Sequence, residues 1–329
     1  MNIEDRTSKS IGHGARPSPA IDQPPVASGT LLKLAAAGLL LGGAAGIAMS
    51  RRGPEPSRAS RLAAGGAALL AASVLADSAM EHYKGNYKKP AMHVAPIAAA
   101  ITLATAVATG LSRRASHIKS MVFGGAVVTG LFGLGFHAKN ILERPGGLSF
   151  NNLFYRAPFG APGALVLAGL AGLGAVDARN ADDPDEYGYA TGAPQVGRFV
   201  GAMTALGLFG LTAEVGLLHF RGAFHDKAMY APIAVLPLTG LAVAANATSL
   251  SSPKLNARAR TALKTTMALG VAGTGFHAYG VSRNMGGFAN WTQTLFQGPP
   301  LAAPPSLLGL GLMGLAALDL LDPDEDDNV

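Results

Sequence analysis

The chain has 329 residues, of which 49% are hydrophobic, only 14% are charged and 43 are glycine. Because soluble chains carry about 25% charged residues, this composition argues against soluble domains. There is no cysteine, which excludes disulfides, thiolate metal sites and a cysteine nucleophile. The formal net charge of +6 comes from lysines and arginines dispersed between apolar runs. Such a distribution is typical of membrane proteins and does not indicate nucleic-acid binding.

The apolar runs predict an all-α integral membrane protein with about nine transmembrane helices. Their lengths are close to the ~20 residues that a helix needs to cross a bilayer, and none of them alternates as a strand would. Residues 1–28 are expected to form a flexible polar tail, and 29–50 a first helix that is retained rather than cleaved as a signal peptide. The expected spans are 31–49, 61–82, 91–111, 118–138, 161–178, 197–218, 228–248, 262–280 and 302–321.

The sequence also repeats itself at an offset of 136 to 142 residues. Residues 82–85 (HYKG) are matched by 219–222 (HFRG), and 135–138 (GFHA) are matched by 275–278 (GFHA). A nearly constant offset over several motifs predicts an internal duplication. Further matches pair 91–97 with 228–233, 146–147 with 286–287, 161–162 with 303–304, and 183–186 with 322–325.

The duplication divides the chain into two tandem four-helix repeats, at 61–178 and 197–321, which the first helix precedes. An acidic linker, 179–196, joins the repeats, and an acidic tail, 322–329, follows them. Because each repeat has an even number of spans, both copies enter the membrane in the same orientation. The expected arrangement is a parallel repeat about a pseudo-two-fold axis along the membrane normal.

The matched histidines fall at span ends that alternate onto one side of the membrane, called the motif face below. Most of the aromatic residues fall on that side too, so the loops after His137 and His277 are expected to build an extra structured layer there. Loops on the opposite side carry more lysine and arginine, although those of the N-terminal tail offset the difference. The interpretation is a bacterial inner-membrane protein whose motif face points outward.

Histidines are the first candidates for a cofactor site. Glycines at Gly133 and Gly273, four residues before His137 and His277, lie on the same helix face as these imidazoles. They predict a flat notch in which a haem macrocycle lies against the helix with a histidine on its iron. Two alternatives stay open: the histidines bond loop carbonyls, and the glycines permit close helix packing. The candidate ligands are His82, His137, His219 and His277.

Two acidic residues are the second candidates. Asp77 and Glu214 lie within apolar spans at matched positions, five residues before His82 and His219. An ionisable group inside a membrane span predicts proton transfer or a polar network, although it is also compatible with a bond to a neighbouring helix. Five residues turn an α-helix by about 140°, so each acid points away from the following histidine.

Four further charged residues also occupy matched positions. Lys84 and Arg221 follow the paired histidines directly. They are expected to join the polar network, bind a lipid headgroup or quinone, or anchor the helix by snorkelling. Asp177 and Asp319 lie near the opposite ends of their spans, beside acidic segments. We expect both of these carboxylates to be solvated.

Three functions fit these features. The first is a membrane subunit of a respiratory or redox complex that carries b-type haem or a quinone pocket and anchors partner subunits on the motif-face loops. The second is a structural or assembly subunit without chemistry of its own. The third is a proton-coupled transporter that uses Asp77 and Glu214. No nucleophile–base pair and no complete metal-ligand set can be read, so catalysis by this chain alone is not expected. The lipid bilayer is the other expected partner.

Overall fold

The computed structural model describes residues 57–112, 116–155, 159–182, 192–248 and 252–321. Every regular element in these ranges is a helix, as the sequence predicted. The first expected span, 31–49, lies outside the described residues, as do both terminal tails and residues 183–191 of the acidic linker.

The long helices come in two groups of four along the chain. The first group contains α2 (Arg58–Lys84), α3 (Val94–Leu111), α4 (His117–Leu142) and α6 (Gly160–Asp182). The second contains α8 (Ala193–Arg221), α9 (Tyr230–Ala247), α10 (Pro253–Arg283) and α12 (Pro305–Leu321). Short helices lie in the connections: η1 (Pro90–His93), α5 (Phe150–Tyr155), η2 (Lys227–Met229), η3 (Gly287–Asn290) and α11 (Trp291–Gln297).

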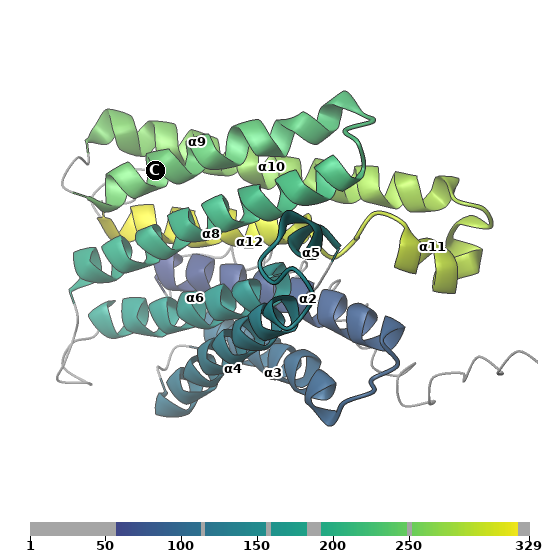
Figure 1. Ribbon diagram of the computed structural model, residues 1–329. Helices are drawn as coiled ribbons and strands as arrows, with labels where there is room; N and C mark the ends of the chain where they lie inside the picture. Colours follow the sequence, from purple (N-terminus) through teal and green to yellow (C-terminus); the bar gives the residue numbers. More distant parts are fainter. Residues whose placement is uncertain (1–56, 113–115, 156–158, 183–191, 249–251, 322–329) are drawn as a thin grey trace, which may run out of the picture.

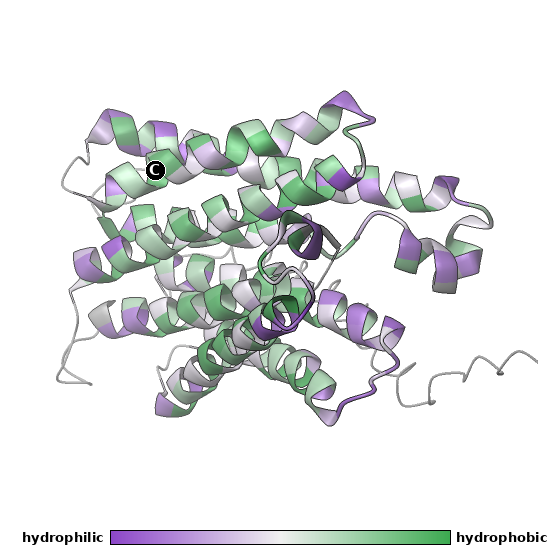
Figure 2. Cartoon of the chain, in the orientation of Figure 1, coloured by the Kyte–Doolittle hydropathy of each residue, from purple (hydrophilic) through white to green (hydrophobic). Residues whose placement is uncertain are grey.

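Six described helices are long and apolar enough to cross a membrane: α2, α3 together with η1, α4, α6, α8, and α9 together with η2. Helix α12 is equally apolar but has only 17 residues. Helix α10 is the longest, at 31 residues, and carries four basic residues in its first half, Lys254, Arg258, Arg260 and Lys264. Hydrophilic residues gather at the helix ends and in α5 and α11, while the middles of the helices are apolar (Figure 2). These lengths and this distribution are those of an integral membrane protein.

The core is a ring of four helices in which α2 contacts α6, α6 contacts α8, α8 contacts α12, and α12 contacts α2. Helices α2 and α8 therefore occupy opposite corners. Outside the ring, α3 packs on α2 and α4 on α6, while α9 packs on α8 and α10 on α12 (Figure 1). The outer helices also pack on each other in pairs, α3 on α4 and α9 on α10.

Small residues allow these helices to approach closely. A Cβ at Gly66 of α2 would lie 2.8 Å from the carbonyl oxygen of Gly309 in α12. Close approach of backbones is the main source of helix association in lipid, where water no longer drives apolar surfaces together. Helices α2 and α12 are buried along nearly their whole lengths, and most of their buried side chains are Ala, Leu or Gly.

Tight turns end the first helix of each group. Asn86 and Tyr87 follow α2 with φ of 57° and 46°, and Ala223 and Phe224 follow α8 with φ of 56° and 47°. Left-handed backbone is uncommon for residues other than glycine, so a pair of such residues in each turn marks a specific geometry. These turns direct the chain back along the motif face toward η1 and η2.

Candidate functional site

The structure brings the two buried acids together. Asp77 lies on α2 and Glu214 on α8, at opposite corners of the core, and both side chains are half-buried. Their carboxylates are close enough to interact electrostatically. Both acids lie toward the motif-face ends of their helices, which pack around an apolar core formed mainly by Ala, Leu and Val. Sequence matching predicted both acids but did not predict that they interact.

Glu214 also caps a helix. Its carboxylate accepts a hydrogen bond from the backbone N–H of Gly160, the first residue of α6. A Cβ at position 160 would overlap this carboxylate, so only glycine fits there without a shift. A helix N-terminus carries unpaired N–H groups and a partial positive charge, which favour an anion at this point.

Asp77 has a different environment. Within the described part of the chain no group donates a hydrogen bond to its carboxylate, and its charged neighbours are Glu81, Glu214 and Lys84. One turn earlier on α2, the Ser73 hydroxyl donates to the carbonyl of Ala302, in the segment before α12. Asp77 therefore faces two other acids and a single cation, and that cation lies two turns away at the end of its own helix.

The histidines bond backbone carbonyls through Nδ1. His82 pairs with the carbonyl of Met92, His219 with that of Met229 at 2.7 Å, and His277 with that of Pro300 at 2.7 Å. In each case the bond ties the end of a long helix to a later connecting segment. The simpler alternative, a histidine that bonds a loop carbonyl, is confirmed for these three residues.

The histidines also form two pairs, one in each group of helices. His82 is an electrostatic neighbour of His137, and His277 of His219. Among the described residues, no group of three or more His, Asp or Glu side chains is arranged to hold a metal ion.

The glycine notch expected beneath His137 and His277 is filled by protein. A Cβ at Gly133 would lie 2.9 Å from Cβ of Pro162, and a Cβ at Gly273 would lie 3.2 Å from Cβ of Pro304. The notch hypothesis is wrong at this point, because the two glycines admit proline rings from neighbouring segments. The alternative, that glycine permits close helix packing, is confirmed at Gly133 and Gly273.

The loops after α4 and α10 each reach the first core helix of the other group. Phe150 of α5 packs edge-on against Phe220 of α8, with ring centroids 6.3 Å apart. Phe296 of α11 lies 5.3 Å from the ring of Tyr83 on α2. Both loops contain short helices, so the prediction of a structured layer after His137 and His277 is confirmed.

Lys84 and Arg221 have separate surroundings. Lys84 Nζ donates to Glu81 at 2.6 Å and lies 5.8 Å from the centre of the Phe296 ring. Arg221 is exposed at the end of α8. Of these two cations, Lys84 is the one that is an electrostatic neighbour of Asp77.

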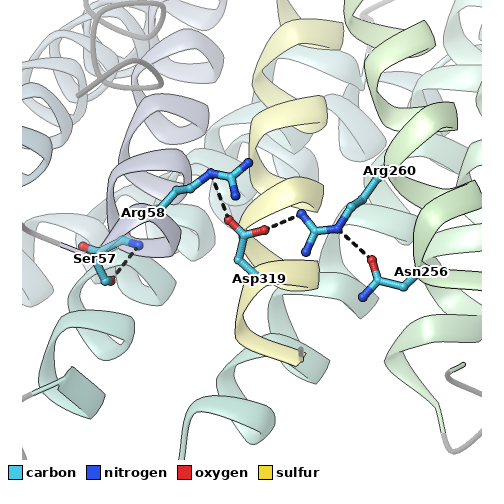
Figure 3. A network of polar contacts seen from close by, with 6 residues as sticks. Ser57, Arg58, Asn256, Arg260 and Asp319 are labelled. Atoms are coloured by element: carbon cyan, nitrogen blue, oxygen red, sulfur yellow. Dashed lines mark hydrogen bonds and ion pairs between the residues drawn. The ribbon is translucent and has the colours of Figure 1, made fainter. Parts of the chain in front are cut away.

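At the opposite end of the core, Asp319 forms an ion network that the sequence did not predict. Its side chain is only 4% exposed and lies between Arg260 of α10, at 2.5 Å, and Arg58 of α2, at 3.6 Å (Figure 3). The Arg260 Nε–H donates to Asn256 at 2.8 Å. The expectation of a solvated Asp319 is therefore wrong, whereas its sequence match, Asp177, is exposed. The basic residues in the first half of α10 were the available signal.

Comparisons with known proteins add no assignment to these features. No protein-family model matches the chain, and no curated protein or solved structure matches it either.

Proposed function

We propose that the chain has nine membrane helices: a first helix over 31–49, followed by two parallel four-helix repeats. The order of the described elements supports the repeats, since four long helices with a 3-10 turn after the first and short helices after the third occur twice. Equal left-handed geometry after α2 and α8 supports them too, as do the left-handed pairs Gly146-Gly147 and Gly286-Gly287. The bonds from His82 and His219 to matched methionine carbonyls point the same way.

We infer that the protein transfers protons across or into the membrane, with Asp77 and Glu214 as a shared proton site. The observation that carries this proposal is the approach of the two carboxylates inside an apolar helical core. An ionised carboxylate is costly in such surroundings, and two of them repel each other, so the pair favours a bound proton. Intramembrane acids with these properties are typical of proton relays.

The path from this pair to the motif face runs along α2. Asp77, Glu81 and Lys84 lie at positions i, i+4 and i+7, which share one helix face. Glu81 is exposed and holds Lys84 at 2.6 Å, so it connects the buried acid with water. On α8 the position that matches Glu81 is Leu218. The proton route therefore leaves through the first repeat.

The proposal is tested with the full-length protein reconstituted in liposomes that contain a pH-sensitive dye, under a potassium-driven membrane potential. We expect a proton flux above that of empty liposomes, which falls at least about tenfold in Asp77→Asn/Glu214→Gln, because both proton-binding carboxylates are lost. Asp177→Asn is the matched control, since Asp177 is an exposed carboxylate at the other end of the core. Wild-type flux equal to that of empty liposomes, or an unchanged flux in the double variant, would rule out this mechanism.

A second candidate is a membrane subunit of a redox complex that holds b-type haem or a quinone near the motif face. It is supported by the Nδ1–carbonyl bonds of His82, His219 and His277, since such a bond fixes the tautomer with Nε2 as the remaining ligand atom. The loops with α5 and α11 would then dock a partner subunit on the outer side of a bacterial inner membrane. An optical spectrum and solvent extraction of natively purified protein decide the matter: neither a Soret band nor quinone would eliminate this candidate.

A further inference from the structure

A shallow apolar groove runs along the outer face of α10. It is lined by Ala272, Gly275, Phe276 and Tyr279, which lie at positions i, i+3, i+4 and i+7 of the helix. Phe276 is 56% exposed and Tyr279 60% exposed, while a Cβ at Gly275 would meet nothing within 4 Å. In an integral membrane protein this face contacts lipid, so an apolar chain is its natural occupant.

A cation stands at the motif-face end of this groove. Arg283 is exposed in the last turn of α10, and its Nη1 donates to the Tyr279 hydroxyl at 3.0 Å. Its guanidinium also lies 5.7 Å from the centre of the Tyr279 ring. These contacts hold the guanidinium over the groove and use one of its five N–H groups for the hydroxyl bond. Its other N–H groups could donate to a ligand with several acceptor oxygens, such as a phosphate.

We propose that this face of α10 binds an anionic phospholipid, with one acyl chain in the groove over Gly275 and the phosphate on Arg283. An aromatic side chain beside a basic one is the usual composition at the membrane interface, where lipid headgroups lie. An arginine fork matches phosphate oxygens in geometry as well as in charge. The apolar groove matches the acyl chain of a phospholipid, and the cation at the end of the groove matches its phosphate.

The matched face of α4 differs at the two positions that hold Tyr279 and Arg283 on α10, which makes the site specific to the second half of the chain. Gly135 is open there as Gly275 is, but Lys139 and Glu143 stand where Tyr279 and Arg283 stand on α10. Lys139 pairs with Glu143 at 3.5 Å. The cation is therefore already neutralised, and the carboxylate repels a phosphate.

The experiment measures lipid retention by native mass spectrometry of the full-length protein, with phosphatidylglycerol and phosphatidylcholine of identical acyl chains as probes. We expect wild type to retain phosphatidylglycerol about tenfold more strongly. Arg283→Gln is expected to remove this preference and Arg283→Lys to keep part of it. Gly275→Leu fills the groove and is expected to weaken both lipids about tenfold.

Gly135→Leu is the matched control, because it places the same side chain on an equally open glycine of α4. Equal retention of the two lipids by wild type would overturn the proposal, as would equal losses in Gly135→Leu and Gly275→Leu. All these changes lie outside the carboxylate pair, so the result is independent of proton transfer.

Discussion

The two ends of the helical core are held by different kinds of interaction. At the end away from the motif face, Asp319 is a buried carboxylate with two guanidinium partners, Arg58 and Arg260. At the motif face, the chain is fixed mainly by neutral groups that bond backbone carbonyls, among them the hydroxyls of Ser73 and Tyr87. One end therefore depends on charge pairing and the other mainly on neutral hydrogen bonds.

This difference separates a structural acid from a candidate functional one. The two guanidinium groups compensate the charge of Asp319, so this residue connects α2, α10 and α12. It is not expected to bind or release a proton during function. Asp77 interacts electrostatically with Glu214 instead, and its cationic neighbour, Lys84, already pairs with Glu81. Buried acids that lack a compensating charge are the ones expected to change protonation. We therefore expect a mutation of Asp319 to lower stability more than proton flux. A mutation of Asp77 or Glu214 should lower proton flux more than stability.

The largest effect is expected from Asp319→Ala. It leaves the Arg260 side chain, only 15% exposed, without its ion-pair partner, and removes the link to Arg58 as well. Breaking a buried pair on one side costs about 3 kcal/mol. The free energy of unfolding is measured by titration with a denaturing detergent, and proton flux should fall only as the protein unfolds.

Asp177→Ala is the control for this change, because Asp177 occupies the matched position and is exposed. We expect it to alter the free energy of unfolding by no more than about 0.5 kcal/mol. Equal losses in the two variants would show that the ion network does not distinguish the two ends.

Gly160→Ala should have a smaller effect on stability and a clear one on activity. The new Cβ would overlap the Glu214 carboxylate, which must then leave the N-terminus of α6. Overpacking of this kind costs about 1–3 kcal/mol. The displaced carboxylate would also lose its approach to Asp77, so proton flux in liposomes should fall.

The matched variant is Gly163→Ala, one turn further along α6, where a Cβ meets nothing within 4 Å. Alanine is the better helix former, so stability should hold or rise by up to about 1 kcal/mol. If Gly160→Ala kept full flux, the position of Glu214 against α6 would not matter for function.

The helices were largely predictable from the sequence because bilayer thickness fixes the length of an apolar run. Helix ends were less so: α2 begins at Arg58 rather than near 61, since Arg61 is 3% exposed and belongs inside the helix. Helix α10 starts at Pro253, nine residues before its expected span. Its basic residues extend the helix beyond the apolar part, and hydropathy alone does not detect such an extension.

The site was predictable only in part. Matched positions identified Asp77 and Glu214, but their approach depends on which helices occupy opposite corners of the core, and spacing does not encode that. The environment of Asp319 depends on Arg58 and Arg260, which come from two distant helices. The filling of the glycine notch by Pro162 likewise depends on a packing contact and not on local sequence.

The smallest effect is expected from Tyr87→Phe and tests the neutral character of the motif-face end. Tyr87 is 8% exposed, and its hydroxyl donates to the carbonyl of Ala79 at 3.1 Å. Loss of this hydrogen bond should lower the free energy of unfolding by about 1 kcal/mol near neutral pH. The second half of the chain carries Phe224 at the matched position and has no such hydroxyl.

Burial raises the pKa of the Tyr87 phenol above its ordinary value. The folded state therefore keeps the proton at a pH where the unfolded chain has begun to release it. Its stabilising contribution is complete below about pH 10, the ordinary pKa of tyrosine, and is lost as the pH rises through the folded-state value. Unfolding measured from pH 8 to pH 11 should show a steeper alkaline loss in wild type than in Tyr87→Phe. If the free energy of unfolding fell equally with pH in the two proteins, ionisation of Tyr87 would not destabilise this end of the core.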